Sequence, residues 1–374
     1  MKALCLLLFL SSTSLLIAQS PGTRNIFIIT IDGVRWQEIF TGADTGLIHD
    51  PRFVSDTSLL QDVYGGDSPE RRREKLLPFF WQVIARKGQL SGNRLYQNKV
   101  NVSNFYKISY PGYNEIFTGY ADPRPVLNSP KPNNNINVLE YLNTQEEYRG
   151  RVAAFCSWDI LPYVLNETRN SLPINGGYES VEEADSASVV INQVQKNVQV
   201  RNHCRYDALT FVAAKEYIQR EHPRVLVLGL GETDEFAHQK KYDLYLQQLT
   251  AIDKMISDIW YLVQTDPFYR NNTSFIITTD HGRGRKPTAW YAHNLFVKGS
   301  GETWQAMIGA GIPAAGELRE NGQIFQKQLA ATIAALAGKR FISNHAAAEA
   351  LVLSGQPLAV VSAGIDTGTD MARK

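Results

Sequence analysis

Asn25-Ile26-Phe27-Ile28-Ile29-Thr30-Ile31-Asp32-Gly33 is the stretch of this sequence that decides the fold. Its run of mostly β-branched residues shows no polar alternation, which predicts a strand buried on both faces. Residues 151–156, 225–230 and 275–279 have the same character, and helical stretches separate them, the clearest over 241–264. The sequence therefore predicts an α/β fold with a mostly parallel central sheet and helices on both faces.

The composition excludes several classes of protein. The 374 residues include 38 Lys+Arg and 37 Asp+Glu, a formal net charge of +1. This balance argues against nucleic-acid binding by bulk charge and against an acidic disordered chain. With only three Cys, the chain cannot form a four-thiolate zinc site. A metal site here must therefore be made of Asp, Glu and His.

The first 19 residues differ from the rest. Lys2 precedes an apolar run over 3–10, which continues more weakly to Ala18. This pattern predicts a signal peptide over 1–19 and an exported protein, either periplasmic or extracellular. An uncleaved membrane anchor is disfavoured because polar residues interrupt the run, and no later segment is apolar for long enough to cross a bilayer. In the mature chain, Cys156 and Cys204 either form a disulfide or stay as buried thiols.

The mature chain has no internal repeat and no long linker. We expect a single catalytic domain over 20–355, with loop insertions near 43–72, 121–135 and 163–183. The charged run 70–74 is interpreted as a solvated helix start. Helices are expected near 323–337 and 344–353, followed by a tail over 356–374.

Acidic residues follow three of the predicted strands. Asp32 comes directly after the first strand, Asp234 follows the strand that ends at Leu230, and Asp280 follows the strand that ends at Thr279. Ligands of an open parallel sheet bind beyond the carboxyl ends of its strands. These carboxylates are therefore expected to converge at one rim of the sheet.

Histidines accompany two of these carboxylates. Asp234 and His238 have the D-x-x-x-H spacing that puts both side chains on one face of a helical turn. His281 follows Asp280 directly, and His293 lies twelve residues further on. Each pair alone is more often a turn or a hydrogen bond, but together and in this order they favour a metal site. Imidazole and carboxylate are good zinc ligands, and mixed sets suit hydrolysis.

A candidate nucleophile precedes a short predicted helix. Ser109-Tyr110-Pro111-Gly112 opens that helix, with Pro near its first position, and Gly119 ends it. Ser109 is then at or near the N-cap, where free N–H groups favour an anion. Ser109 is either only the cap or, if held against a metal ion, an attacking nucleophile.

Taken in order, these motifs resemble the alkaline phosphatase superfamily over roughly residues 24–310, most of all its nucleotide pyrophosphatase/phosphodiesterase-type and related secreted phosphatase branches. The resemblance implies two divalent metal ions, usually Zn²⁺. It implies that one ion is held by Asp234, His238 and His293. The other is held by Asp32, Asp280 and His281 with the Ser109 oxygen. It further implies hydrolysis of a small-molecule phosphate monoester or diester through a phosphoseryl intermediate.

Some positions depart from the family pattern. The phosphodiesterase-type branch usually has Thr where this chain has Ser109, and serine does the same chemistry. Sulfatases of the superfamily have an Arg two residues after the Pro, where this chain has Tyr113. An Asn downstream of the nucleophile contacts a phosphoryl oxygen in the phosphodiesterase branch, and Asn128 is its candidate here. Arg35, Arg283 and Arg285 are either substrate contacts or solvated side chains.

The sequence offers three alternatives to phosphoric ester hydrolysis. A sulfatase or phosphonate hydrolase remains an alternative within the same superfamily. A phosphosugar mutase is disfavoured by the predicted export, and a non-enzymatic binding protein by the presence of every expected ligand residue. The sequence leaves open the substrate, the preference for monoesters or diesters, the identity of the metal and the oligomeric state.

Overall fold

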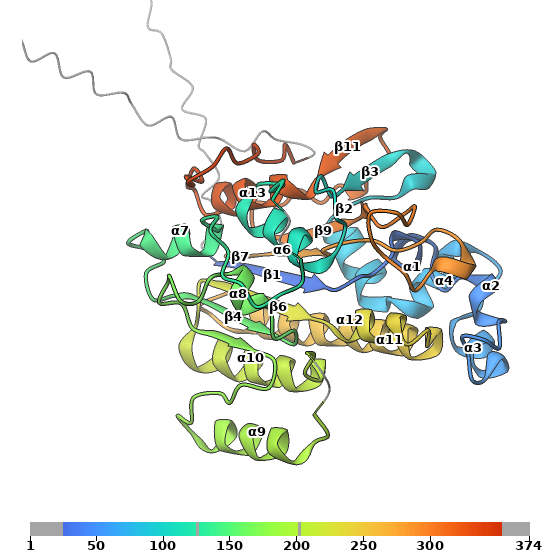
Figure 1. Cartoon of the computed structure of the whole chain (residues 1–374), viewed down its shortest axis with the longest axis horizontal. Helices are drawn as coiled ribbons and strands as arrows, with labels where there is room; N and C mark the ends of the chain where they lie inside the picture. The colour runs from blue at the N-terminus through green and yellow to red at the C-terminus, as the bar shows by residue number, and fades with distance from the viewer. Residues whose placement is uncertain (1–24, 125–126, 201–202, 354–374) are drawn as a thin grey trace, which may run out of the picture.

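The fold is built around one central sheet. The structure, a computed structural model, describes residues 25–124, 127–200 and 203–353. Eight strands follow the order β10-β2-β9-β7-β1-β6-β4-β5 (Figure 1). In that order they are β10 (Gly316–Glu317), β2 (Gly88–Ser91), β9 (Gln305–Gly309), β7 (Thr273–Thr278), β1 (Asn25–Ile31), β6 (Val225–Leu230), β4 (Val152–Cys156) and β5 (Ile174–Gly176). Only β9 runs antiparallel to its neighbours, β7 and β2.

The four strands predicted from the sequence are β1, β4, β6 and β7, and they lie side by side. β1 pairs in parallel with both β6 and β7, and β4 pairs in parallel with β6. The predicted α/β fold with a mostly parallel sheet is therefore confirmed.

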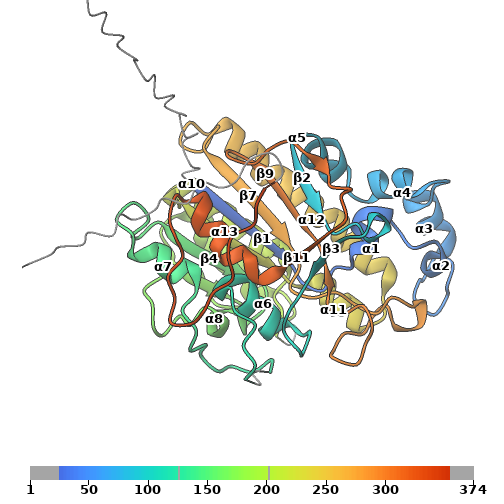
Figure 2. The ribbon, with the colours of Figure 1, turned by 90° about the horizontal axis from the view of Figure 1, so that it is seen from above.

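Helices cover both faces of the sheet (Figure 2). On β1, Phe27 and Ile29 belong to the apolar cluster that includes α10 (Asp207–Glu221) and α12 (Tyr242–Thr265). Ile26 and Ile28 point the other way, into the cluster of α6 (Ser109–Thr118), α7 (Val138–Thr144) and α13 (Leu329–Leu336). β1 is apolar on both faces because both are buried, which explains its lack of polar alternation.

The other elements are mostly short. A small sheet has the order β11-β3-β8, formed by β11 (Gly322–Phe325), β3 (Asn98–Asn101) and β8 (Glu302–Thr303). A π-helical turn covers Phe80–Ile84, and 3₁₀ turns cover Arg94–Tyr96, Pro287–Ala289 and Gln326–Gln328. The remaining helices are α1 (Trp36–Thr41), α2 (Thr45–Ile48), α3 (Thr57–Tyr64), α4 (Pro69–Leu76), α5 (Ala85–Lys87), α8 (Leu161–Val164), α9 (Ser186–Asn197) and α11 (Glu232–His238).

Of the three helices predicted near 70–74, 323–337 and 344–353, one is confirmed, one is shortened and one is absent. The charged run 70–74 does lie in a helix, α4, whose N-cap Ser68 accepts a hydrogen bond from the Arg71 N–H. The helix expected over 344–353 is absent, because this stretch is pinned in an irregular path by the Ala348 N–H donating to Gly119 O and the Leu351 N–H donating to Thr332 Oγ1. The helix expected over 323–337 is shortened to α13, since its first residues join β11.

Cys156 and Cys204 are free, buried thiols, which resolves the alternative that the sequence left open. The predicted signal peptide (1–19) and C-terminal tail (356–374) lie outside the described residues. Within the described ranges, none of the helices combines the length and the apolar character needed to cross a membrane.

A close backbone approach fixes helix α6 to the sheet edge. A Cβ atom at Gly112 would lie 2.3 Å from the backbone oxygen of Asp280. We predict that Gly112→Ala lowers the free energy of unfolding by about 1–3 kcal/mol, because the helix must move away from the sheet. Urea denaturation measures this loss.

Gly322→Ala is the matched control, since the nearest atom to its added Cβ lies 3.9 Å away. Equal denaturation midpoints for the two variants would contradict the close contact at α6.

Candidate metal centre

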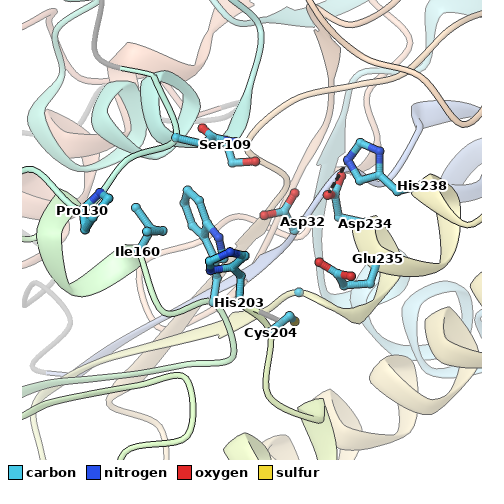
Figure 3. Close-up of a pocket in the computed structure, with 12 residues that line it drawn as sticks. Asp32, Ser109, Pro130, Ile160, His203, Cys204, Asp234, Glu235 and His238 are labelled. Atoms are coloured by element: carbon cyan, nitrogen blue, oxygen red, sulfur yellow. Dashed lines mark ion pairs between the residues drawn. The ribbon is translucent and has the colours of Figure 1, made fainter. Parts of the chain in front are cut away.

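Three neighbouring strands deliver the candidate ligands to one rim of the sheet. Asp32 follows β1, and Asp280 with His281 follows β7. Asp234 and His238 lie on α11, directly after β6, and face the same space as Asp32 (Figure 3). Since β1, β6 and β7 are adjacent and parallel, their carboxyl ends coincide. This convergence is the one expected from the sequence.

Asp32, Asp280 and His281 form a buried group whose ligand atoms lie within 4.8 Å of one another. His281 Nε2 is 3.4 Å from Asp32 Oδ1 and 3.4 Å from Asp280 Oδ2. Both of these carboxylate oxygens are buried and accept no hydrogen bond. Buried carboxylate oxygens normally accept hydrogen bonds or pair with a positive charge. This group therefore has the ligand atoms of a cation site, and two of them lack a hydrogen-bond partner.

A second group adjoins the first. Asp234, His281 and His293 also offer ligand atoms within 4.8 Å of one another. His238 joins them, with its Nε2 atom 3.0 Å from Asp234 Oδ2 and 3.1 Å from His293 Nε2. The rings of His281 and His293 are stacked, 3.7 Å apart between centroids. The two groups therefore share His281 and form one continuous cluster.

Backbone carbonyls orient two of the imidazoles. His281 Nδ1 is 3.0 Å from Gly282 O, and His293 Nδ1 is 3.3 Å from Lys107 O. A carbonyl only accepts, so each Nδ1 atom carries the proton and each neutral ring turns its Nε2 lone pair to the carboxylates. Metal-binding histidines are commonly held in this way.

The electrostatics of the first group point in the same direction. Burial, followed by the charge of Asp280, raises the pKa of Asp32 well above its usual value, and burial raises the pKa of Asp280 to about 7. Burial also lowers the pKa of His281 and of His293. The carboxylates are thus costly to ionise together, whereas the imidazoles stay neutral and ready to coordinate.

Ser109 stands beside both groups. It is the first residue of α6, one position inside the N-cap Ile108, and its Oγ atom is 3.4 Å from His281 Nε2. Gly112 packs against the Asp280 backbone, and the Tyr113 hydroxyl donates to Asp32 Oδ2 at 3.3 Å. The helix therefore packs with its N-terminus against the group formed by Asp32, Asp280 and His281.

A cavity of about 280 Å³ opens in front of Ser109. Asn128 lines it, and its Oδ1 atom accepts from the Tyr110 N–H at 2.9 Å. The lining also includes residues that the sequence did not predict to be part of the site. Figure 3 labels Pro130, Ile160, His203, Cys204 and Glu235 among them, and Trp158 is a further one.

Some of these residues could have been found from sequence. Trp158 and Ile160 follow the end of β4, so the rule that selected the aspartates applies to them as well. His203 and Cys204 reach the cavity because Cys204 forms a β-bridge with Trp158. That long-range pairing leaves no signal in the sequence.

The three arginines near the motifs do not line the cavity. Arg35 pairs with Glu38, and Arg285 pairs with Glu302. Arg283 is buried, donates to Gly33 O at 2.8 Å and pairs with one oxygen of Asp234. No Lys or Arg is among the described residues that line the cavity.

Comparison with known proteins identifies the family of this chain. The model of the metalloenzyme superfamily matches residues 96–289, more than half of the chain, a range that holds Ser109, Asp234, His238, Asp280 and His281. A comparison with curated proteins gives no match.

Solved structures share the fold at low sequence identity. The alkaline phosphatase PafA is 10% identical with a TM-score of 0.55, and the match covers 88% of this chain and 98% of PafA. BT1596, a 2-O GAG sulfatase, is 12% identical with a TM-score of 0.53, covering 86% and 72%. The lipoteichoic acid synthase LtaP from Listeria monocytogenes is 10% identical with a TM-score of 0.52, covering 85% and 72%. The chain thus belongs to the metalloenzyme superfamily and has an alkaline phosphatase-like fold.

Proposed function

We propose that the protein is a metal-dependent hydrolase of phosphoric esters in which Ser109 is the nucleophile. The observation that carries this proposal is the position of Ser109 Oγ, 3.4 Å from His281 Nε2, at the first residue of α6 and on the wall of the cavity. A serine between a helix N-terminus and a cluster of metal-ligand side chains is well placed to attack an anionic ester.

The donor sets fit two divalent ions, with Zn²⁺ favoured by the mixture of imidazole and carboxylate. Asp234, His238 and His293 would hold one ion, and Asp32, Asp280 and His281 the other, beside Ser109. Such ions supply positive charge that lowers the pKa of a serine hydroxyl and neutralises the phosphoryl and leaving oxygens. The acidic cavity, which has no Lys or Arg in its described lining, supports this division of roles.

The chain itself contributes the nucleophile and its orientation. The bond from Ser109 Oγ to phosphorus forms as the bond from phosphorus to the leaving oxygen breaks, which gives a phosphoseryl intermediate. Water then attacks phosphorus, and Ser109 regains its hydroxyl as phosphate or a phosphomonoester departs. Dipoles at the N-terminus of α6 favour the anion throughout.

Asn128 is the proposed substrate contact. Its Oδ1 atom already accepts from the Tyr110 N–H, so the amide Nδ2 group is the part that remains for the cavity. An amide N–H donates to a phosphoryl oxygen without adding charge, which suits a site whose charge comes from elsewhere.

Sulfate ester hydrolysis is the second candidate, since a 2-O GAG sulfatase shares the fold. The position that sulfatases of the superfamily fill with Arg is Tyr113, whose hydroxyl is engaged by Asp32. This difference favours an unmodified Ser109 and phosphoric esters. Export through the N-terminal signal peptide is part of the same proposal.

Ser109→Ala tests the nucleophile. We expect kcat/KM of the zinc-loaded protein for p-nitrophenyl phosphate or bis-p-nitrophenyl phosphate to fall by about 10³-fold or more, because no other group takes over the attack. Zinc content should not change, since six other ligands remain. Ser68→Ala, which removes a serine from the N-cap of α4, is the control and should keep full activity. Turnover that survives in Ser109→Ala would exclude the mechanism.

Metal binding should depend on pH in a defined direction. The metal-free folded protein retains protons on Asp280, and on Asp32, at pH values where the unfolded chain has lost them. Zinc must displace these protons, so its affinity should rise between about pH 5 and pH 8, with proton release. Calorimetry in buffers of different ionisation enthalpy measures both quantities.

The same groups set the stability of the metal-free protein. Because the pKa of Asp280 is raised on folding, to about 7, its contribution is fully present below the unfolded value of 3.8 and is lost as the pH rises through 7. Thermal unfolding should therefore show metal-free protein losing Tm over this window and regaining it with zinc. For the preceding prediction, a zinc affinity that stays constant from pH 5 to pH 8 would contradict the raised pKa values of Asp32 and Asp280.

A further inference from the structure

Hydrogen bonds connect the loop over residues 127–135, which carries Asn128, to helix α6. The Tyr110 N–H donates to Asn128 Oδ1 at 2.9 Å, and the Tyr110 hydroxyl donates to the backbone oxygen of Lys131 at 2.6 Å. One helical turn further on, Asn114 Oδ1 accepts from Asn133 Nδ2 at 2.9 Å. One face of the nucleophile helix therefore holds the loop.

The deepest of these contacts is a cluster of three buried amides, Asn114, Asn133 and Asn135, each no more than 4% exposed. Asn114 Oδ1 accepts from both partners, at 2.9 Å from Asn133 Nδ2 and 3.1 Å from Asn135 Nδ2. Asn114 Nδ2 donates to Tyr120 O at 2.7 Å. Buried amides are costly unless they are paired, so the cluster holds one geometry.

A second segment holds the loop from the opposite side. The backbone oxygen of Asn133 accepts from Asn166 Nδ2 at 2.6 Å and from Arg169 Nη1 at 2.9 Å. The Asn133 N–H donates to Tyr163 O at 2.9 Å. The loop is thus fixed between α6 and residues 163–169, although its described residues 127–135 form no helix or strand.

Helix α6 consequently presents two different faces. Gly112 and Tyr113 contact Asp280 and Asp32, whereas Tyr110 and Asn114 contact the loop. Asn114 does not line the cavity, so it does not itself contact a ligand bound there.

We propose that Asn114 is a positioning residue, which holds Asn128 in register with Ser109 by anchoring the loop through Asn133 and Asn135. This inference rests on the proposed function. Asn128 is itself exposed, and an exposed side chain on a loop is free to adopt several conformations. Its amide can donate a hydrogen bond of fixed geometry to a phosphoryl oxygen only if the loop is held in place. The anchor ties that geometry to the helix that carries the nucleophile.

A double-mutant cycle on the zinc-loaded full chain tests the proposal. Asn114→Ala, Asn128→Ala and the double variant are compared by kcat/KM for p-nitrophenyl phosphate and bis-p-nitrophenyl phosphate, and by calorimetric affinity for inorganic phosphate. We expect Asn114→Ala to lower kcat/KM and phosphate affinity by about tenfold, with zinc content unchanged. The double variant should be no worse than Asn128→Ala, because Asn114 acts through Asn128.

The control is Asn98→Ala, which removes another buried amide, one that donates to Glu320 O at 3.0 Å and lies in the small sheet. It should lose stability but keep kcat/KM and phosphate affinity. If Asn114→Ala does not fold, Asn133→Ala and Asn135→Ala replace it in the cycle, because each removes one of the two amides that donate to Asn114 Oδ1.

Two outcomes overturn the positioning role. The first is a double variant whose loss equals the product of the two single losses, and the second is an equal loss in Asn98→Ala. If wild type binds phosphate but cleaves no ester, the proposed function fails while the phosphate cycle still decides the role of Asn114. If wild type binds no phosphate, both proposals are overturned.

Discussion

The interaction on which the rest of the structure depends is the close approach of two buried carboxylates, Asp32 and Asp280, at the carboxyl ends of the adjacent strands β1 and β7. Two oxygens without hydrogen bonds, Asp32 Oδ1 and Asp280 Oδ2, each lie 3.4 Å from the same imidazole nitrogen. Such a group is unfavourable when fully ionised, and it is relieved either by protons, as the raised pKa values show, or by cations. The end of the sheet therefore provides a group of side chains suited to bind either protons or a cation.

Helix α6 packs closely against this site through a glycine and a tyrosine hydroxyl. Gly112 allows its backbone to touch Asp280, and Tyr113 donates to Asp32. Gly33, in the left-handed region with a φ of 63°, likewise leaves room for the side chains of Arg283 and Asp234. These close approaches bring Ser109 within reach of both groups of ligands, which no flexible loop would do with the same accuracy.

The nearly neutral composition of the chain fits this arrangement. A net charge of +1 gives no general attraction for anions, and no Lys or Arg occurs in the described lining of the cavity. In the proposed hydrolase, bound dications would supply this attraction at the site itself. Two of the three arginines next to the motifs pair away from the candidate ligands, Arg35 with Glu38 and Arg285 with Glu302, whereas Arg283 pairs with Asp234.

The sequence by itself determined the four central strands, the parallel sheet and the rim at which Asp32, Asp234 and Asp280 would meet. These features follow from local apolar runs and from the rule that parallel strands end at one edge, so they need no knowledge of distant contacts. Only the tertiary structure decided the far wall of the cavity, the thiol state of Cys156 and Cys204, and the irregular path of residues 344–353. It also decided that Asn133 and Asn135, in the predicted loop 121–135, are buried and donate to Asn114 of α6. Each of these depends on hydrogen bonds or packing between residues far apart in the chain, which override local propensity and leave no periodic pattern in the sequence.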